Sequence, residues 1–265
     1  MLINKTYFID SCNDVELNIK RESKLEYRIT YDDSKEMKAI VFILDGYGAN
    51  VDLSVIDFTR QFIAQKFDVV AVSVLYHCFC QRKSNMKNYS AVTTFLEDDL
   101  LNLKLALEKL NINTGNLNTH NAWQYYGYLN QTISSLKEQN LLNQDYKVHL
   151  TAAFIPPNNE YQNYGIMASV DVMNALKDII KNYPQFKSLP KIYGGLSYGG
   201  YLALMCAKIA PWYVDGVIDN SGEALLLLNY IIGRDLNLSD CVFYENNFII
   251  NTFLKTYWTR DLHST

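Results

Sequence analysis

One serine in the chain has the neighbours that nucleophilic catalysis requires. Ser197 lies at the centre of the run Gly195-Leu196-Ser197-Tyr198-Gly199, which matches the pattern G-x-S-x-G. In this pattern the hydroxyl projects from a very tight turn between a strand and a helix, and the glycines remove Cβ atoms that would clash with nearby backbone. A short strand at 191–195 and a mostly apolar helix at 198–209 supply that context. We predict that Ser197 is the nucleophile on such a turn, the nucleophile elbow. The alternative is a glycine-rich turn with an exposed serine.

A second run could supply hydrogen-bond donors to the same reaction. Acyl transfer needs two backbone N–H groups aimed at the oxygen that gains negative charge. One would come from Tyr198, the residue after the nucleophile, and the other from a loop after an earlier central strand. Asp45-Gly46-Tyr47-Gly48 directly follows the apolar run 39–44, so we predict that Tyr47 provides the second N–H. A plain strand-to-helix turn that uses glycine for its geometry would fit the same run.

A serine nucleophile of this type also needs an acid and a histidine base that follow it in the chain. The aspartates after Ser197 are Asp215, Asp219, Asp235, Asp240 and Asp261. Asp219, at the end of the strand after the elbow, is the predicted acid, and capping of a helix beside Asn220 and Ser221 is its alternative role. His263 is the only histidine after the serine. It lies two residues from the end of the sequence, where side chains are usually solvated, and is a poor base.

The histidines before Ser197 are weaker candidates still. His77 closes a central strand and is expected to face the site, whereas His120 lies in a polar loop and His149 in a predicted strand. The motif uses a histidine that follows the serine in the chain, and all three of these histidines precede it.

The cysteines favour a reduced protein without a metal site. There are five, an odd number, and no pair has the C-x-x-C spacing. Cys78-x-Cys80 beside His77 would need further ligands to hold a metal ion, and a strand end with small apolar side chains explains it as well. We therefore expect free thiols, no metal and no organic cofactor.

Charge and hydropathy argue against two classes of partner. The net charge is −4, and the densest basic cluster is only Gln81-Arg82-Lys83 with Lys87 nearby, so we expect no nucleic acid partner. The longest apolar runs, such as 225–228, are far too short to span a bilayer, and residues 1–5 lack the apolar stretch of a signal peptide. We expect a small-molecule substrate, no membrane partner and a cytoplasmic location.

The elements before the insertion predict a parallel sheet with an antiparallel beginning. Residues 1–37 should form β structure, because apolar and polar residues alternate between 24 and 31. Residues 39–44 and 67–75 are apolar almost without interruption, which is typical of central strands covered on both faces. Apolar residues between 52 and 65 recur at helical spacing, which predicts a helix between these two strands. The strand, helix and strand would form a βαβ unit, which is right-handed by default.

Residues 77–143 interrupt the alternation of strands and helices. One face of a helix is formed by Leu96, Leu100, Leu103, Leu107 and Leu110. A loop follows at 111–121, and a second helix is expected from about 122 to 142. This helical insertion in a single domain of residues 1–265 would form either a lid over the site or a structural appendage. The alternation then resumes with a helix at 167–182 and, after the elbow, a strand at 214–219.

The order of these features resembles the α/β-hydrolase superfamily, in its prolyl-oligopeptidase or esterase branch. The resemblance rests on the leading β segment, Asp45-Gly46-Tyr47-Gly48, the insertion and the G-x-S-x-G run, and it covers most of the chain. More closely, the chain resembles a bacterial family of unknown function within that superfamily, whose members occur mainly in flagellated, host-associated bacteria near genes for surface-sugar modification. The resemblance implies an α/β fold, a mostly parallel sheet flanked by helices, and a serine esterase or acyltransferase. It suggests an acylated sugar as the substrate.

The chain departs from the superfamily pattern after the elbow. In the superfamily, further helices and strands follow the strand that ends at Asp219 and precede the loop that carries the histidine. These elements together take roughly 55 residues, and the sequence has fewer residues than that after Gly222. We therefore expect a C-terminally truncated chain that lacks its last one or two strands and a complete triad, so that catalysis is impaired. The missing strands would leave a sheet edge exposed. The alternatives are an inactive remnant, half of a split protein completed by a separate C-terminal chain, and a protein that binds a ligand without chemistry.

Overall fold

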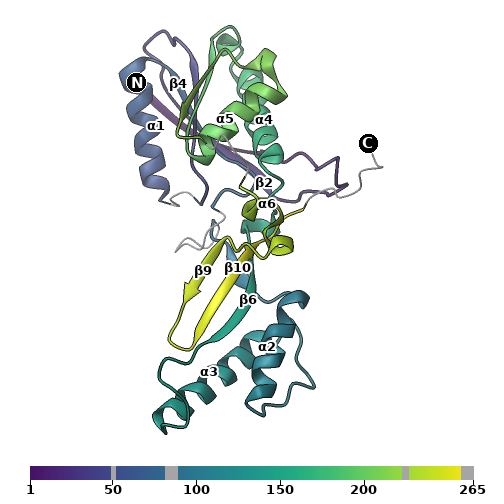
Figure 1. The fold of residues 1–265 in the computed structure, drawn as a ribbon. Helices are drawn as coiled ribbons and strands as arrows, with labels where there is room; N and C mark the ends of the chain where they lie inside the picture. Colours follow the sequence, from purple (N-terminus) through teal and green to yellow (C-terminus); the bar gives the residue numbers. More distant parts are fainter. Residues whose placement is uncertain (49–51, 81–88, 223–226, 258–265) are drawn as a thin grey trace. The chain divides into compact units, whose positions relative to one another are not determined.

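The chain folds into two compact units. The computed structural model describes residues 1–48, 52–80, 89–222 and 227–257 (Figure 1). The first unit comprises Met1–Ser90, Pro156–Leu226 and Tyr257–Thr265, and the second comprises Ala91–Ile155 and Leu227–Thr256. Each unit has a sheet of its own.

The first unit is built on a six-stranded sheet that is mostly parallel. Its strand order is β1-β2-β4-β3-β7-β8. Their bounds are Leu2–Asp10 (β1), Lys24–Asp32 (β2), Ile40–Leu44 (β3), Val70–Leu75 (β4), Lys191–Leu196 (β7) and Gly216–Asn220 (β8). The pairs β1·β2 and β2·β4 are antiparallel, and β4, β3, β7 and β8 run parallel to one another. The predicted α/β fold with an antiparallel N-terminal segment is confirmed.

Helices cover both faces of this sheet. They are α1 (Leu53–Phe67), α4 (Ile166–Asn182) and α5 (Tyr198–Ile209), with α1 on one face and α4 and α5 on the other (Figure 1). The Asp52 side chain caps α1 by accepting a hydrogen bond of 2.9 Å from the Ser54 N–H, which satisfies one of the unpaired donors at a helix start. At the other end, Asp68 takes the left-handed conformation and ends the helix.

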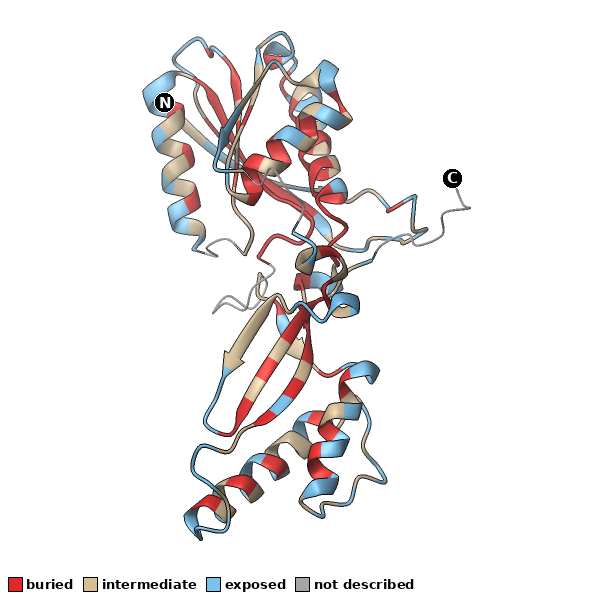
Figure 2. Cartoon of the chain, viewed as in Figure 1, coloured by how far each residue is buried: buried red, intermediate tan, exposed pale blue. Residues whose placement is uncertain are grey.

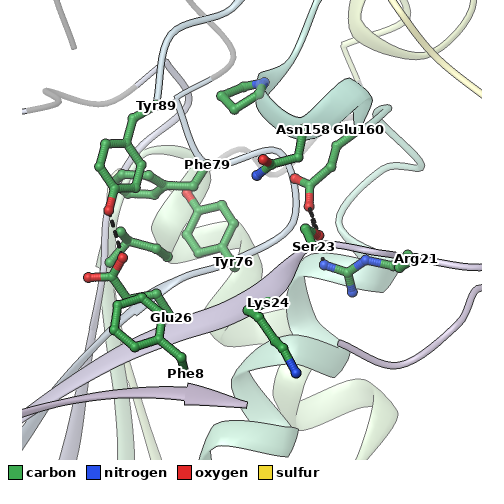
Figure 3. A pocket seen from close by; sticks show the side chains of 12 residues that line it. Phe8, Arg21, Ser23, Lys24, Glu26, Tyr76, Phe79, Tyr89, Asn158 and Glu160 are labelled. Atoms are coloured by element: carbon green, nitrogen blue, oxygen red, sulfur yellow. Dashed lines mark hydrogen bonds and ion pairs between the residues drawn. The ribbon is translucent and has the colours of Figure 1, made fainter. Parts of the chain in front are cut away.

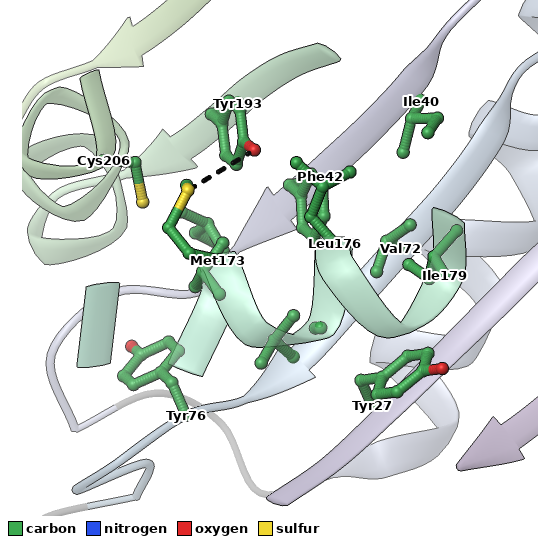
Figure 4. Close-up of a cluster of buried hydrophobic side chains, with 14 of the residues drawn as sticks. Tyr27, Ile40, Phe42, Val72, Tyr76, Met173, Leu176, Ile179, Tyr193 and Cys206 are labelled. Carbon is green, nitrogen blue, oxygen red and sulfur yellow. Dashed lines mark hydrogen bonds between the residues drawn. The ribbon is translucent and has the colours of Figure 1, made fainter. Parts of the chain in front are cut away.

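The core of the first unit lies between the sheet and α4. Every residue of β4 is buried, and the rings of Phe42 and Tyr193 stack at 4.7 Å. Met173 and Leu176 of α4 pack toward these rings (Figure 4). The burial of both strand faces is the reason for the continuous apolar runs in the sequence, and the buried residues follow the strands and the inner side of α4 (Figure 2).

The second unit is a four-stranded sheet with three helices. Its strand order is β5-β6-β10-β9, with β6 and β10 parallel and the other pairs antiparallel. The strands are β5 (Val92–Thr94), β6 (Val148–Ile155), β9 (Cys241–Tyr244) and β10 (Phe248–Leu254), and the helices are α2 (Glu97–Lys109), α3 (Ala122–Glu138) and α6 (Asn229–Leu236). The sequence predicted the helices α2 and α3 but not this sheet. Its central pair joins segments far apart in the chain, and local periodicity carries no signal of such a pairing.

Within the described residues β8 is an edge of the six-stranded sheet. It pairs only with β7, and the side chain of Ile218 is 60% exposed. After β8 the described chain continues into the second unit, with residues 227–256. Among the helices of the described ranges, none combines the length and the apolar character that a membrane span needs.

Candidate active site

Ser197 occupies a strained turn between β7 and α5. Its backbone has φ 54° and ψ −122°, a region that non-glycine residues avoid at a cost of about 1–3 kcal/mol. Two hydrogen bonds hold the turn: the Ser197 N–H donates to the Asn220 carbonyl at 2.9 Å, and the Tyr201 N–H donates to the Ser197 carbonyl at 3.2 Å. The hydroxyl itself bonds to no described residue. The turn therefore presents a serine on strained backbone, with a hydroxyl that no described residue binds.

The glycines around Ser197 are required by close backbone packing. A Cβ at Gly195 would lie 2.1 Å from the carbonyl carbon of Gly199, and a Cβ at Gly199 would lie 2.0 Å from the carbonyl oxygen of Leu44. Real Cβ atoms do not approach other atoms so closely. This crowding explains why the G-x-S-x-G pattern has glycine at both positions.

The loop after β3 lies directly against the elbow. A Cβ at Gly46 would be 3.1 Å from the Leu196 carbonyl oxygen and 3.5 Å from the Ser197 Cβ. The Tyr47 ring meets the Tyr198 ring edge-on at 5.8 Å. Because Tyr198 is the first residue of α5, its N–H has no acceptor inside the helix, and it donates to no described residue. Of the two proposed donors, the Tyr198 N–H is thus available, and the role of the Tyr47 N–H stays a prediction.

Asp45 is a titratable group beside the elbow that sequence analysis did not single out. Its carboxylate forms no hydrogen bond with a described residue. Burial raises its pKa to about 6, because desolvation disfavours the charged form. The Asp45 carbonyl accepts a hydrogen bond of 2.8 Å from the Tyr76 hydroxyl. In the sequence, only the place of Asp45 directly after a buried strand could have marked it.

Asp219 holds the turn after β8. Its Oδ1 accepts a hydrogen bond of 2.7 Å from the Gly222 N–H, and a Cβ at Gly200 would lie 2.2 Å from the same oxygen. No histidine of the described ranges bonds to it. Its service as the catalytic acid stays a prediction.

The described histidines either bond to residues other than Ser197 or belong to the second unit. Buried His77 was expected to face the site, but its Nε2 lies 2.6 Å from the Tyr161 carbonyl oxygen and its backbone N–H donates to Asp171 at 2.9 Å. His120 and His149 belong to the second unit, and His263 lies outside the described residues. Within the described ranges no hydrogen bond therefore joins Ser197 to a histidine base.

A buried ion cluster holds the segment that follows β4. Arg21 binds both carboxylate oxygens of Asp171, at 2.7 and 2.8 Å. The Cys78 N–H donates to Glu160 at 2.6 Å. Burial raises the pKa of Asp171 and Arg21 opposes this rise. Burial also disfavours the Glu160 anion, but His77 and the Cys78 N–H outweigh this and hold the Glu160 pKa below its usual value.

The same segment carries two cysteines on strained backbone. Cys78 and Cys80 have φ values of 63° and 59°, and both are buried as free thiols. Burial, with a smaller contribution from Asp45, raises the pKa of Cys80 well above its usual range, so this thiol stays protonated. In the part of the chain that the structure describes, no group of three His, Cys, Asp or Glu side chains could hold a metal ion.

Comparisons with known proteins give a family and a set of distant structural neighbours. Residues 5–265 match the model of a family described as Protein of unknown function (DUF2920). Among curated proteins, none matches the sequence.

The structural neighbours include three named hydrolases. A Pyrobaculum calidifontis esterase is 14% identical, with 82% of this chain and 44% of that chain covered and a TM-score of 0.39. Dienelactone hydrolase from Anabaena variabilis is 13% identical, with coverages of 83% and 64% and a TM-score of 0.38. Acylaminoacyl peptidase from Pyrococcus horikoshii is 12% identical, with coverages of 83% and 23% and a TM-score of 0.42. The match spans less than two thirds of each of these chains, and at such identities no activity transfers from them.

Proposed function

The chain belongs to the family described as Protein of unknown function (DUF2920), and we propose that it is a serine-dependent ester hydrolase or acyltransferase with Ser197 as the nucleophile. One observation carries this proposal. Ser197 is held at φ 54° and ψ −122° at a strand-to-helix turn, with the loop of Gly46 packed against it. A turn that only connected β7 to α5 would gain nothing from a strained serine.

The reaction would proceed through an acyl-enzyme. The Ser197 oxygen attacks the carbonyl carbon of an ester and loses its proton to a base, and the carbonyl electron pair moves to the oxygen. The Tyr198 N–H, together with the Tyr47 N–H, stabilises that oxyanion. When the carbonyl re-forms, the alcohol leaves with a proton. Water then releases the acid in hydrolysis, or a second alcohol takes the acyl group in transfer.

The base, the acid and the substrate belong to the proposal as well. We propose Asp219 as the acid, and a base supplied either by His263 or by a separate complementing chain. Without a base, only the oxyanion donors and substrate binding would accelerate the reaction, and the activity would be low. An acylated sugar is the proposed substrate, on the resemblance alone, and the cytoplasm is the proposed location.

Labelling with a fluorophosphonate probe tests the nucleophile, because such probes react covalently only with activated serines. The full chain is compared with Ser197→Ala and with Ser221→Ala. Ser221 is a fair control because it is exposed, lies close in the chain and also has a positive φ, of 57°. We expect labelling of the wild type and of Ser221→Ala and none of Ser197→Ala. An unlabelled wild type that circular dichroism shows to be folded would mean that no base within this chain activates Ser197.

A third variant locates the base. If His263 is the base, His263→Ala should slow labelling at least about a hundredfold, the size of a general-base contribution. If His263→Ala reacts as fast as the wild type, the base lies elsewhere, and native mass spectrometry of the protein isolated from its host would test for a bound second chain.

A further inference from the structure

A pocket in the first unit is lined by residues other than those proposed for catalysis, and the ring of one lining residue, Tyr76, lies 6.4 Å from the ring of Tyr198. Its volume is about 240 Å³. Three aromatic residues line one part of it: Tyr76, Phe79 and Tyr89. The rings of Tyr76 and Phe79 meet at 5.6 Å with an angle of 88° between their planes, and those of Phe79 and Tyr89 meet at 6.3 Å with an angle of 90°. Three rings in successive perpendicular planes form a partial aromatic cage (Figure 3).

Two carboxylates complete the lining of this aromatic cage. Glu26 accepts a hydrogen bond of 2.6 Å from the Tyr89 hydroxyl, and Glu160 accepts one of 3.1 Å from the Ser23 hydroxyl (Figure 3). Burial and the bond to Glu26 raise the Tyr89 pKa to about 12, so the phenol stays neutral and donates. The pKa of Glu160 is held below its usual value, so this carboxylate carries its charge at neutral pH.

Basic side chains also line the pocket, but their charge is compensated. Arg21 is bound through both terminal nitrogens by Asp171, and Lys24 pairs with Asp10. Arg21 also contacts Glu160, with its Nη2 3.4 Å from Oε1, whereas Asp171 and Asp10 do not line the pocket. Glu26 bonds to Arg28 through Oε1 only, which leaves its Oε2 with the Tyr89 hydroxyl and one further lone pair. The groups still able to interact with a ligand are thus the ring faces and the Glu26 Oε2.

We propose that this aromatic cage binds an organic ammonium cation, with a quaternary ammonium group as the best fit. The positive charge lies against the ring faces, which carry negative electrostatic potential. The Glu26 carboxylate adds attraction without requiring an N–H donor on the ligand, whereas Glu160 is already bound by Arg21 and the Cys78 N–H. Tyr76 and Phe79 are only 2% and 4% exposed, so packing fixes these two rings, which lowers the entropic cost of binding. Tyr89 is only half-buried and offers the more accessible ring face. Binding of a cation in this aromatic cage does not require the reaction proposed for Ser197.

The test compares choline with its neutral carbon isostere, 3,3-dimethylbutan-1-ol, on the full wild-type chain by NMR titration. The two probes have the same shape and differ in charge. We expect choline to bind about 2- to 30-fold more tightly, since cation–π contacts contribute roughly 0.5–2 kcal/mol and 1.4 kcal/mol is tenfold. The methyl signal of bound choline should move upfield because the rings shield it. Equal affinity of the two probes, or no saturable binding of choline up to 50 mM (about −2 kcal/mol), overturns the proposal.

Two substitutions at Tyr89 locate the site. Tyr89→Phe keeps the ring and removes only the hydroxyl, so choline affinity should fall less than about threefold. Tyr89→Leu removes the ring and should cost about tenfold. Both are checked for folding by circular dichroism, and Tyr89 is only half-buried, which favours folded variants. If the variants do not fold, the comparison of the two probes on the wild type still decides the proposal. Equal choline affinity of two folded variants overturns the assignment to this aromatic cage.

Discussion

The Tyr76 hydroxyl donates a hydrogen bond of 2.8 Å to the Asp45 carbonyl oxygen. This bond joins the segment after β4 to the loop after β3, and that loop packs against Ser197 through Gly46. His77, the residue after Tyr76, is fixed by a hydrogen bond from its backbone N–H to buried Asp171. A continuous set of contacts therefore connects the buried ion cluster to the turn that presents the serine.

Tyr76→Phe should disturb the elbow more than the fold. It deletes one buried hydrogen bond and should lower the free energy of unfolding by about 1 kcal/mol. If the bond fixes the loop, fluorophosphonate labelling of Ser197 should slow about tenfold, since small displacements of catalytic groups have large kinetic effects. Tyr193→Phe is the matched control, because the Tyr193 hydroxyl donates to the Tyr213 carbonyl at 3.2 Å. Equal labelling rates in the two variants would refute the positioning role.

Gly199→Ala should destabilise the first unit strongly. The new Cβ would lie 2.0 Å from the Leu44 carbonyl oxygen. Either β3 or α5 must therefore move, at a cost of about 3 kcal/mol or more. Gly127→Ala in α3 is the contrasting variant, because its Cβ would meet no atom within 4 Å. It should stabilise the second unit by about 1 kcal/mol through helix propensity. Urea unfolding followed by circular dichroism measures both. A harmless Gly199→Ala would contradict the described packing.

Ser197→Gly should make the protein more stable and chemically inert. Glycine tolerates the backbone angles of φ 54° and ψ −122° that strain serine, so the free energy of unfolding should rise by about 1 kcal/mol. Ser197→Ala keeps the strained Cβ and should show no such gain. Labelling should be lost in both variants. A glycine variant no more stable than the alanine variant would mean that the turn stores no strain.

Asp45→Asn should stabilise the protein at neutral pH and not in acid. The folded-state pKa of about 6 lies above the ordinary aspartate value of 3.8, so the folded protein binds this proton more tightly than the unfolded chain. The favourable contribution is complete below pH 3.8 and disappears as the pH rises through 6. At pH 7.5 the buried anion therefore costs about 3 kcal/mol, at 1.36 kcal/mol per pKa unit, and the neutral amide avoids this cost.

Urea unfolding at pH 7.5 and at pH 4 measures the effect. We expect a gain near 3 kcal/mol for Asp45→Asn at the higher pH and less than about 1 kcal/mol at the lower one. Asp215→Asn is a suitable control, because Asp215 is exposed and bonds the Lys191 N–H at 2.8 Å; it should lose a little stability at both values. The same gain at both pH values would show that burial of the Asp45 charge is not its cause.

The sequence by itself determined the local features of this protein. Alternating residues predicted β2, uninterrupted apolar residues predicted β3 and β4, and the glycines around Ser197 predicted the turn between β7 and α5. These features depend on neighbours in the chain, since periodicity and the lack of a Cβ act within a few residues.

Only the tertiary structure decided which of these elements meet. It brought Gly46 against Ser197, directed His77 to Tyr161 and Asp171 instead of the serine, and gave Asp45 a raised pKa through burial. It also paired β6 with β10 in a second sheet. The physical reason is that burial, desolvation and backbone pairing depend on residues distant in the chain, so residue type and spacing could identify the serine but not its surroundings.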